Sequence, residues 1–294
     1  MRNPFDQVMQ DQKQVVEHAL HYYMHELDAP HELKEAMQYS LLAGGKRLRP
    51  IFLLATVEAL GGDVQQGLPA ACALEMVHTY SLIHDDLPAL DNDDYRRGKL
   101  TNHKMFGEAV AILAGDALLT YAFEVITRSD SLSPTQLVAM VRELAFRAGP
   151  AGMVGGQTAD VLGEGKKLNL DELIYIHRHK TGDMLVCAVR LGCYIAEATP
   201  AQLHALTRYA EELGLAFQIQ DDLLDIIGQA EKLGKAVGSD QRNQKNTYPS
   251  LVGLDESKKA LERHVLQAKE FLKESGAKPD YLLYLADLMI KREY

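Results

Sequence analysis

The sequence predicts an all-α protein, and three observations carry this prediction. Apolar residues recur at steps of three and four through nearly every long window, which is the spacing of one helix face. A hydroxyl residue followed by proline, a pattern typical of helix starts, occurs twice between these windows. No alternating apolar and polar run is bounded by the Asn-Gly or Asp-Gly turn of a β-hairpin. We therefore expect long helices joined by short loops.

The individual helices follow from these signals in chain order. The first two are predicted by apolar positions on a common face, which are Val15, Val16, Ala19, Leu20 and Tyr23, then Leu33, Ala36, Met37 and Leu41. Two later helices are predicted to start at Ser133-Pro134 and at Thr199-Pro200. Asn169 and Glu172 form a predicted capping box, in which each side chain bonds the backbone N–H of the other residue.

Glycine clusters are predicted to break the helices. They are Gly44-Gly45, Gly61-Gly62, Gly149-Pro150, Gly155-Gly156, Gly163 to Gly165, Gly228 and Gly238. No tract is rich enough in proline, glycine or serine to mark a linker between domains, and no internal repeat is evident. We therefore expect residues 1–294 to form a single domain.

Composition and charge exclude several classes of protein. Hydrophobic residues make up 47% of the 294 residues and charged residues 24%, which is ordinary for a globular protein and excludes general disorder. The chain has 41 acidic residues against 31 basic ones, for a net charge of -10. Non-specific binding to nucleic acid depends on neutralising phosphates, so this balance disfavours a nucleic-acid partner.

Cysteine usage and hydropathy predict a location in the cell. Cys72, Cys187 and Cys193 form no CxxC pair, which suits a reducing compartment. The N-terminal residues lack the apolar run of a secretory signal. The most apolar stretch, residues 109–123, is interrupted by Asp116 and is too short to span a bilayer. We expect a cytoplasmic protein without membrane insertion.

Two aspartate clusters are the clearest candidates for chemistry. They are Asp85, Asp86 and Asp91 in DDLPALD, and Asp221, Asp222 and Asp225 in DDLLD. Carboxylates at helical spacing repel one another, so something must offset them. A solvated acidic surface is one explanation, but it fits poorly because apolar residues flank both clusters closely. Carboxylate oxygens suit hard cations such as Mg²⁺ or Ca²⁺, and Mg²⁺ commonly bridges carboxylates and substrate phosphates. The clusters therefore favour a metal site.

Basic residues gather at a few places in this acidic chain. They lie at residues 44–49, 94–99 and 177–180, with Lys235 and Lys245 after the second aspartate cluster. Any one group alone could be surface charge of little energetic weight. Together with two metal-type clusters, the groups indicate a polyphosphate site, where arginine forks and lysine charges hold phosphate oxygens. The glycines at 44–45 do not match a nucleotide P-loop, which disfavours a nucleotide ligand.

These residues resemble the motifs of trans-prenyl diphosphate synthases. The matching segments are GGKRLRP at 44–50, HTYSLIHDD at 78–86, DDLPALD at 85–91, DDYRRGK at 93–99, AILAGDALL at 111–119, GMVGGQ at 152–157, HRHKTG at 177–182, FQIQDDLLD at 217–225 and KNTYP at 245–249. The resemblance runs from about residue 36 to residue 253. Two extra residues between Asp86 and Asp91, including Pro88, are typical of the bacterial branch that makes a C15 product.

The resemblance implies a fold, a cofactor and a set of site residues. The fold is an isoprenoid synthase fold, a large helical bundle around a deep central cavity, usually found as a homodimer. The implied cofactor is Mg²⁺, bound by Asp85, Asp86, Asp91, Asp221 and Asp225. The residues implied to bind the allylic diphosphate or line the reacting centre are Arg96, Lys180, Thr181, Gln218 and Lys235. Those implied to bind isopentenyl diphosphate are Lys46, Arg49, His78 and Arg97. The implied catalytic set is Asp85, Asp91, Lys180, Thr181, Gln218 and Asp221.

The implied reaction condenses isopentenyl diphosphate with dimethylallyl and then geranyl diphosphate, releasing diphosphate and giving C15 farnesyl diphosphate. Hydrophobic burial alone favours ever longer products, so chain growth needs a steric floor. Tyr80 and Ser81, about one helical turn before Asp85, resemble the length-determining positions. Three alternatives stay open at this stage. They are a geranyl or geranylgeranyl diphosphate synthase, a terpene cyclase with a single diphosphate site, and a non-catalytic helical subunit of a heteromeric synthase.

Overall fold

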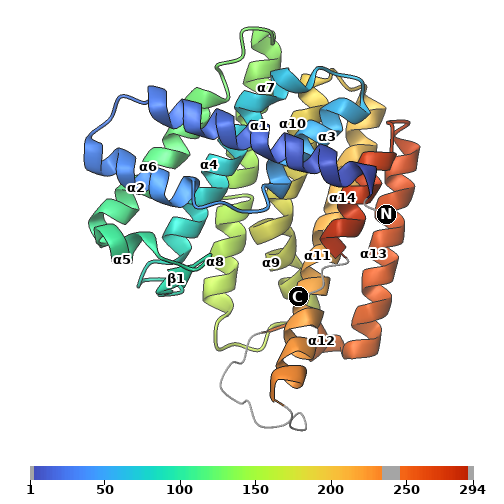
Figure 1. The fold of residues 1–294 in the computed structure, drawn as a ribbon. Helices are drawn as coiled ribbons and strands as arrows, with labels where there is room; N and C mark the ends of the chain where they lie inside the picture. Colours follow the sequence, from blue (N-terminus) through green and yellow to red (C-terminus); the bar gives the residue numbers. More distant parts are fainter. Residues whose placement is uncertain (1–2, 234–245, 291–294) are drawn as a thin grey trace. The chain divides into compact units, whose positions relative to one another are not determined.

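A computed structural model describes residues 3–233 and 246–290, with side chains throughout except at residues 226–233. Within these residues the chain is almost entirely helical, which confirms the all-α prediction (Figure 1). Two compact units are present. Unit 1 comprises Met1–Leu144 and Leu191–Glu197, and unit 2 comprises Ala145–Arg190 and Ala198–Tyr294. Helices α7 (Pro134–Ala148) and α10 (Asp183–Ile195) contribute residues to both units.

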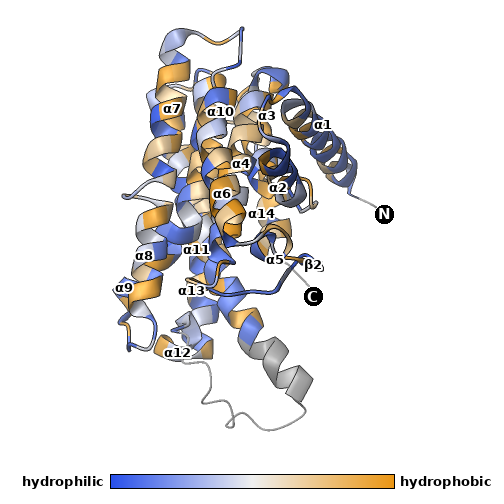
Figure 2. Cartoon of the chain, turned by 90° about the vertical axis from the view of Figure 1, so that its left-hand side faces the viewer, coloured by the Kyte–Doolittle hydropathy of each residue, from blue (hydrophilic) through white to orange (hydrophobic). Residues whose placement is uncertain are grey.

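Unit 1 is built around the contact of α4 with α6. Its elements are α1 (Pro4–Glu26), α2 (His31–Leu41), α3 (Leu48–Ala59), the 3₁₀ helix η1 (Val64–Gly67), α4 (Leu68–Asp85), β1 (Tyr95–Arg96), β2 (Lys99–Leu100), α5 (Asn102–Phe106) and α6 (Glu108–Val125). Helices α2, α4 and α5 all pack against α6. Most of α6 is apolar, as its colour in Figure 2 shows. No helix in the described ranges has both the length and the hydropathy to cross a membrane.

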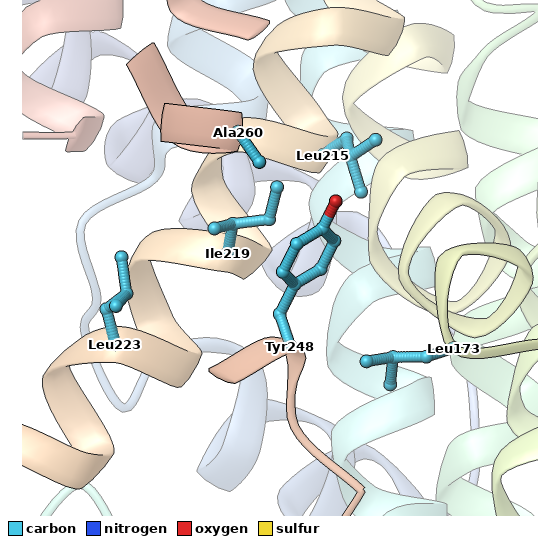
Figure 3. Packing of buried hydrophobic residues seen from close by; sticks show 6 residues of the cluster. All are labelled: Leu173, Leu215, Ile219, Leu223, Tyr248 and Ala260. Atoms are coloured by element: carbon cyan, nitrogen blue, oxygen red, sulfur yellow. The ribbon is translucent and has the colours of Figure 1, made fainter. Parts of the chain in front are cut away.

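Unit 2 is organised along the longest helix of the chain. Its elements are α8 (Met153–Gly163), α9 (Leu170–Ile176), the π-helix η2 (His177–Gly182), α11 (Pro200–Leu233), α12 (Tyr248–Val252), α13 (Leu254–Glu274) and α14 (Asp280–Ile290). Helix α13 packs along α11 (Figure 1). A buried apolar cluster joins α9, α11, α12 and α13, as Figure 3 shows. Its buried members are Leu173, Leu215, Ile219, Leu223, Tyr248 and Ala260.

The predicted helix starts are confirmed. Helix α7 begins at Pro134 and α11 at Pro200. The capping box before α9 forms as expected, because the N–H of Glu172 donates to Asn169 Oδ1 at 3.0 Å and the N–H of Asn169 donates to Glu172 Oε2 at 2.8 Å. These signals are local, so the sequence alone was sufficient to find them.

A short hairpin interrupts the helices where no strand was predicted. Strands β1 and β2 pair antiparallel, with Tyr95 opposite Leu100 and Arg96 opposite Lys99. The turn residues Arg97 and Gly98 have φ values of 54° and 75°, and two successive positive φ values are the mark of a tight primed turn. Arginine occupies a place usually taken by asparagine or aspartate, which is why the turn pattern was missed. The hairpin aims Arg96 and Arg97 at different partners.

Not every predicted glycine break is a break. Gly44 and Gly45 do separate α2 from α3, with φ values of 83° and 143°. Gly155-Gly156 was expected to end a helix but lies inside α8. The reason is close packing, because a Cβ atom on Gly156 would lie 2.1 Å from the backbone nitrogen of Lys180. Gly228 likewise falls within the bounds of α11, and Gly238 lies outside the described residues.

Candidate active site

The first aspartate motif lies at the C-terminal end of α4. Asp85 is the last residue of this helix, and the turn that follows brings the N–H of Asp91 to the Asp85 carbonyl at 2.9 Å. The backbone of these two residues is therefore held together despite the five residues between them. The C-terminus of a helix carries partial negative charge, which adds to the charge of the carboxylates. This end of α4 is a place where cations are stabilised.

The middle aspartate of the motif is held by the hairpin. Arg96 Nε donates to both carboxylate oxygens of Asp86, at 2.8 and 2.9 Å, and Arg96 Nη2 lies 2.6 Å from Oδ1. Asp86 is 3% exposed, and this bond raises the pKa of the Arg96 guanidinium. The carboxylate that was predicted to bind a metal thus has a guanidinium on both of its oxygens. Asp86 fixes the position of Arg96, and its role as a metal ligand stays a prediction.

The four residues predicted to bind isopentenyl diphosphate lie in or near the loop between α2 and α3. Arg49 Nη1 lies 3.3 Å from His78 Nε2, and Arg97 Nη1 donates to the carbonyl of Gly44. A Cβ atom on Gly45 would come within 3.0 Å of the Arg97 guanidinium, so glycine permits this approach. Lys46, in the same loop, is exposed. The geometry gathers several positive charges where an anion could neutralise them.

His78 is neutral in this setting. Burial first, and then the positive charges of Arg49 and Arg97, hold the pKa of His78 well below its usual value. A guanidinium can only donate, so the His78 Nε2 that faces Arg49 is the acceptor and the hydrogen resides on Nδ1. His78 therefore orients Arg49 without adding charge of its own.

Arg47 is a functional candidate that sequence reasoning missed. Its backbone has a φ of 52°, and its buried side chain donates to Glu75 Oε1 at 2.6 Å and to the Leu41 carbonyl at 2.8 Å. This buried pair links α4 to the end of the loop that carries Lys46, directly before α3, whose first turn carries Arg49. Within the basic run Arg47 resembled a surface charge. The available signal was its partner, because Glu75 is the one charged residue in the apolar stretch 68–77.

The second aspartate motif belongs to a chain of hydrogen bonds in unit 2. Thr181 Oγ1 donates to Gln218 Oε1 at 2.7 Å, and Gln218 Nε2 lies 3.4 Å from Asp221 Oδ2. Thr181 is in the π-helix η2, whereas the other two residues are one turn apart on α11. The structure therefore brings together three residues of the implied catalytic set. Asp225, one turn further along α11, is exposed.

The π-helix positions Lys180 as well. Because a π-helix widens the backbone, it shifts side chains away from their α-helical positions, and such turns are frequent at functional sites. Here η2 packs on α8 at Gly156, where the absence of a side chain leaves room for the backbone of Lys180. The Lys180 side chain also reaches α8, because its Nζ donates to Asp160 Oδ2 at 2.6 Å. Asp160 was missed because the recognised segment GMVGGQ ends three residues before it. Lys235 lies outside the described residues.

Asp222 is the middle aspartate of the second motif and is also held by protein groups. Its Oδ2 lies 3.0 Å from His177 Nε2 and accepts the backbone N–H of Tyr248 at 2.8 Å. It thereby links α11 to the start of the π-helix and to the start of α12. The two motifs are alike in this respect. The middle carboxylate of each, Asp86 or Asp222, is hydrogen-bonded to another part of the protein.

The donors that the two motifs offer are compatible with a hard divalent cation. Asp85, Asp91, Asp221 and Asp225 present carboxylate oxygens, which Mg²⁺ prefers to nitrogen or sulfur donors. In the described residues no group of three or more histidine, cysteine, aspartate or glutamate side chains is already gathered as a metal site. Mg²⁺ in proteins is commonly bound by one or two carboxylates together with substrate phosphates and water.

The residues predicted to limit product length lie on α4. Tyr80 is 6% exposed, and burial, aided by the charge of Asp85, raises the pKa of its phenol to about 12. Ser81 Oγ donates to the carbonyl of His78 at 2.9 Å. Tyr80 is thus a neutral, buried ring about one turn before the first aspartate motif, and Ser81 is tied to its own helix.

Comparison with known proteins gives a consistent answer. The polyprenyl synthetase family matches residues 30–281. A farnesyl diphosphate synthase of Geobacillus stearothermophilus is 55% identical over 98% of both chains, and a geranylgeranyl diphosphate synthase of Cyanophora paradoxa is 49% identical over 90% of this chain and 88% of its own. The solved structure of an FPP/GFPP synthase from Zymomonas mobilis has a TM-score of 0.85 at 34% identity, covering 96% of this chain and 99% of its own. The chain therefore belongs to the polyprenyl synthetase family.

Proposed function

We propose that this chain is a farnesyl diphosphate synthase, a prenyltransferase that condenses isopentenyl diphosphate with dimethylallyl and then geranyl diphosphate. One observation carries the proposal beyond family membership. Adjacent residues of one hairpin contact two groups. Arg96 bonds Asp86 of the aspartate motif, and Arg97 bonds Gly44 in the loop that carries Lys46 and leads into the first turn of α3 with Arg49. The two sets of residues proposed to bind diphosphates therefore both contact this hairpin, which supports two sites and not one. A condensation needs two diphosphates, whereas a cyclase needs one.

In the proposed reaction the bond between C1 and the diphosphate oxygen of the allylic substrate breaks. The double bond of isopentenyl diphosphate attacks C1, a proton leaves, and the released diphosphate takes it. Arg96, Lys180 and Lys235 hold the allylic diphosphate, while Lys46, Arg49, His78 and Arg97 hold isopentenyl diphosphate. Thr181 and Gln218 line the reacting centre. Preorganised donors of this kind stabilise charge as it develops on the leaving group.

We propose Mg²⁺ as the cofactor, with Asp85, Asp86 and Asp91 of the first motif and Asp221 and Asp225 of the second as its ligands. Asp86 also holds Arg96 in position. The bound ion supplies positive charge that stabilises the departing diphosphate. Support comes from the carboxylate donors and from the position of the first motif at a helix C-terminus. We also propose a homodimer, which rests on the family resemblance. The proposed cytoplasmic location rests on cysteine usage and hydropathy, and the proposed single domain on the sequence pattern.

Chelation is expected to abolish turnover. Purified protein incubated with isopentenyl and geranyl diphosphates and Mg²⁺ should yield C15 product on chromatography, and excess EDTA should stop it until Mg²⁺ is restored. Inorganic pyrophosphate with Mg²⁺ should also raise the unfolding temperature, by about 2–4 °C for each kcal/mol of binding energy, but not in EDTA. Full turnover in chelator would overturn the metal assignment.

Tyr80→Ala is expected to lengthen the product. Burying five more carbons gains about 4 kcal/mol, at ~0.8 kcal/mol per CH₂, so growth past C15 is limited by space and not by affinity. Removing the ring should therefore add C20 and longer chains to the product. Chromatography of products at equal substrate conversion measures this. Unchanged C15 output would reject Tyr80 as the floor.

A further inference from the structure

Helices α4 and α6 cross closely at His84. A Cβ atom on Gly115 would lie 2.1 Å from His84 Nε2 and 2.5 Å from Cδ2, so the imidazole occupies the space that any larger residue at 115 would need. His84 Nε2 is also 3.1 Å from the carbonyl of Ile112. A carbonyl only accepts, so Nε2 carries the hydrogen and donates it. The backbone of α6 therefore fixes where the His84 ring lies and which way it faces.

The same ring contacts Tyr80. His84 follows Tyr80 by four residues on α4, which places both on one face of the helix. Their ring centroids are 5.6 Å apart with an interplanar angle of 83°, an edge-to-face arrangement. Asp116 Oδ1 lies 3.9 Å from His84 Nε2 and adds a second group of α6 near the imidazole. The Tyr80 ring is thus in contact with an imidazole whose position is fixed by α6.

We propose that His84 and Gly115 are positioning residues for product length, which act by holding the Tyr80 ring in place. The inference rests on the proposed function, and in particular on Tyr80 as the floor. The order of action runs from α6 to α4: Gly115 admits the imidazole, the Ile112 carbonyl orients it, and the imidazole restrains the phenol. Without the His84 contact the Tyr80 side chain can adopt other rotamers. In some of these rotamers the ring no longer blocks a product chain longer than C15.

The first test is His84→Ala. Losing an edge-to-face aromatic partner should raise the ratio of C20 to C15 product by about two- to tenfold. The double variant Tyr80→Ala/His84→Ala should give the same product distribution as Tyr80→Ala alone, because His84 has nothing left to position. Additive lengthening in the double variant would overturn the proposal, since it would make His84 a floor residue in its own right. An unchanged ratio in His84→Ala would overturn it as well.

The second test addresses Gly115. Gly115→Ala should displace the imidazole and shift the product in the same direction as His84→Ala. Gly192→Ala is the matched control, because its Cβ would come within 2.7 Å of the Leu53 carbonyl oxygen and Thr56 Cβ in the same unit. The control should lower the unfolding temperature while leaving the C20 to C15 ratio unchanged. A shifted ratio in the control would show that loosened packing anywhere lengthens the product, and would overturn the specific role.

The outcomes separate this inference from the function on which it rests. If Tyr80→Ala leaves the product at C15, the floor assignment fails and the His84 inference fails with it. If Tyr80→Ala lengthens the product while His84→Ala does not, only the positioning role fails. Absence of C15 product from the wild-type chain would reject the proposed function before either variant is considered.

Discussion

Asp221→Asn is expected to lower kcat by on the order of 10³-fold while leaving the fold intact, the size of loss that removal of one preorganised electrostatic group produces. Asparagine keeps the shape of the side chain and can still accept from Gln218 Nε2, which lies 3.4 Å from Asp221 Oδ2. What it loses is the negative charge proposed to bind Mg²⁺. Steady-state kinetics at saturating substrates and Mg²⁺ measure the effect, and circular dichroism checks the fold.

Asp222→Asn is the matched control for this variant. Its carboxylate accepts the Tyr248 N–H at 2.8 Å, a role that an amide oxygen can also fill. We expect a loss in kcat at least tenfold smaller than that of Asp221→Asn, because the control weakens the contacts with His177 and the Tyr248 N–H but removes no proposed metal ligand. Equal losses at both positions would contradict the division of labour within the motif.

Glu75→Ala is expected to destabilise the protein by about 3–5 kcal/mol, because it removes the buried carboxylate that is hydrogen-bonded to Arg47. The remaining carboxylate, Glu17 Oε1, lies 3.7 Å from Arg47 Nε and is partly exposed. The side chains of Arg47 and Glu75 are only 1% and 3% exposed, so water cannot replace the lost carboxylate without local opening. Such a loss is a large fraction of the ~5–15 kcal/mol that stabilises a typical domain. Urea denaturation followed by circular dichroism measures it.

A second readout links Glu75 to the site. Arg47 lies between Lys46 in the loop and Arg49 in the first turn of α3. Because the buried pair holds this segment, the KM for isopentenyl diphosphate should rise in Glu75→Ala more than the KM for geranyl diphosphate. Glu124→Ala provides the control, because Glu124 pairs with Arg128 at an exposed position where an ion pair contributes ~0–1 kcal/mol. If the stability loss in Glu75→Ala is no greater than in this control, the buried Arg47–Glu75 pair does not hold the loop in position.

Local signals explain how much of the fold the sequence could predict. The starts of α7, α9 and α11 depend on residues within one turn, and these were found. The prediction that Gly155-Gly156 breaks a helix was wrong. Gly156 has no room for a Cβ atom because the backbone of Lys180, which is distant in sequence, packs against it. The hairpin turn at Arg97-Gly98 lacks the usual residue types and was overlooked for that reason.

The candidate site shows the same difference between local features, which the sequence predicts, and contacts between distant residues, which it does not. Carboxylate spacing and basic runs were sufficient to identify the two motifs. Which carboxylate braces the protein depends on partners from other elements, as with Arg96 for Asp86 and the Tyr248 N–H for Asp222. The buried Arg47–Glu75 pair and the bond from Lys180 to Asp160 likewise join residues 28 and 20 positions apart. No pattern within a short window contains such pairs.

The π-helix at residues 177–182 affects how this segment can be aligned with related sequences. Successive residues of an α-helix are rotated by about 100° about its axis, and a π-turn accommodates one additional residue without rotating the segments on either side. Deleting a single residue there would restore α-helical winding and remove the bulge that presents Lys180 and Thr181. Alignments that slide a gap through this segment would therefore assign the lysine and threonine to the wrong face, even where every neighbouring letter matches.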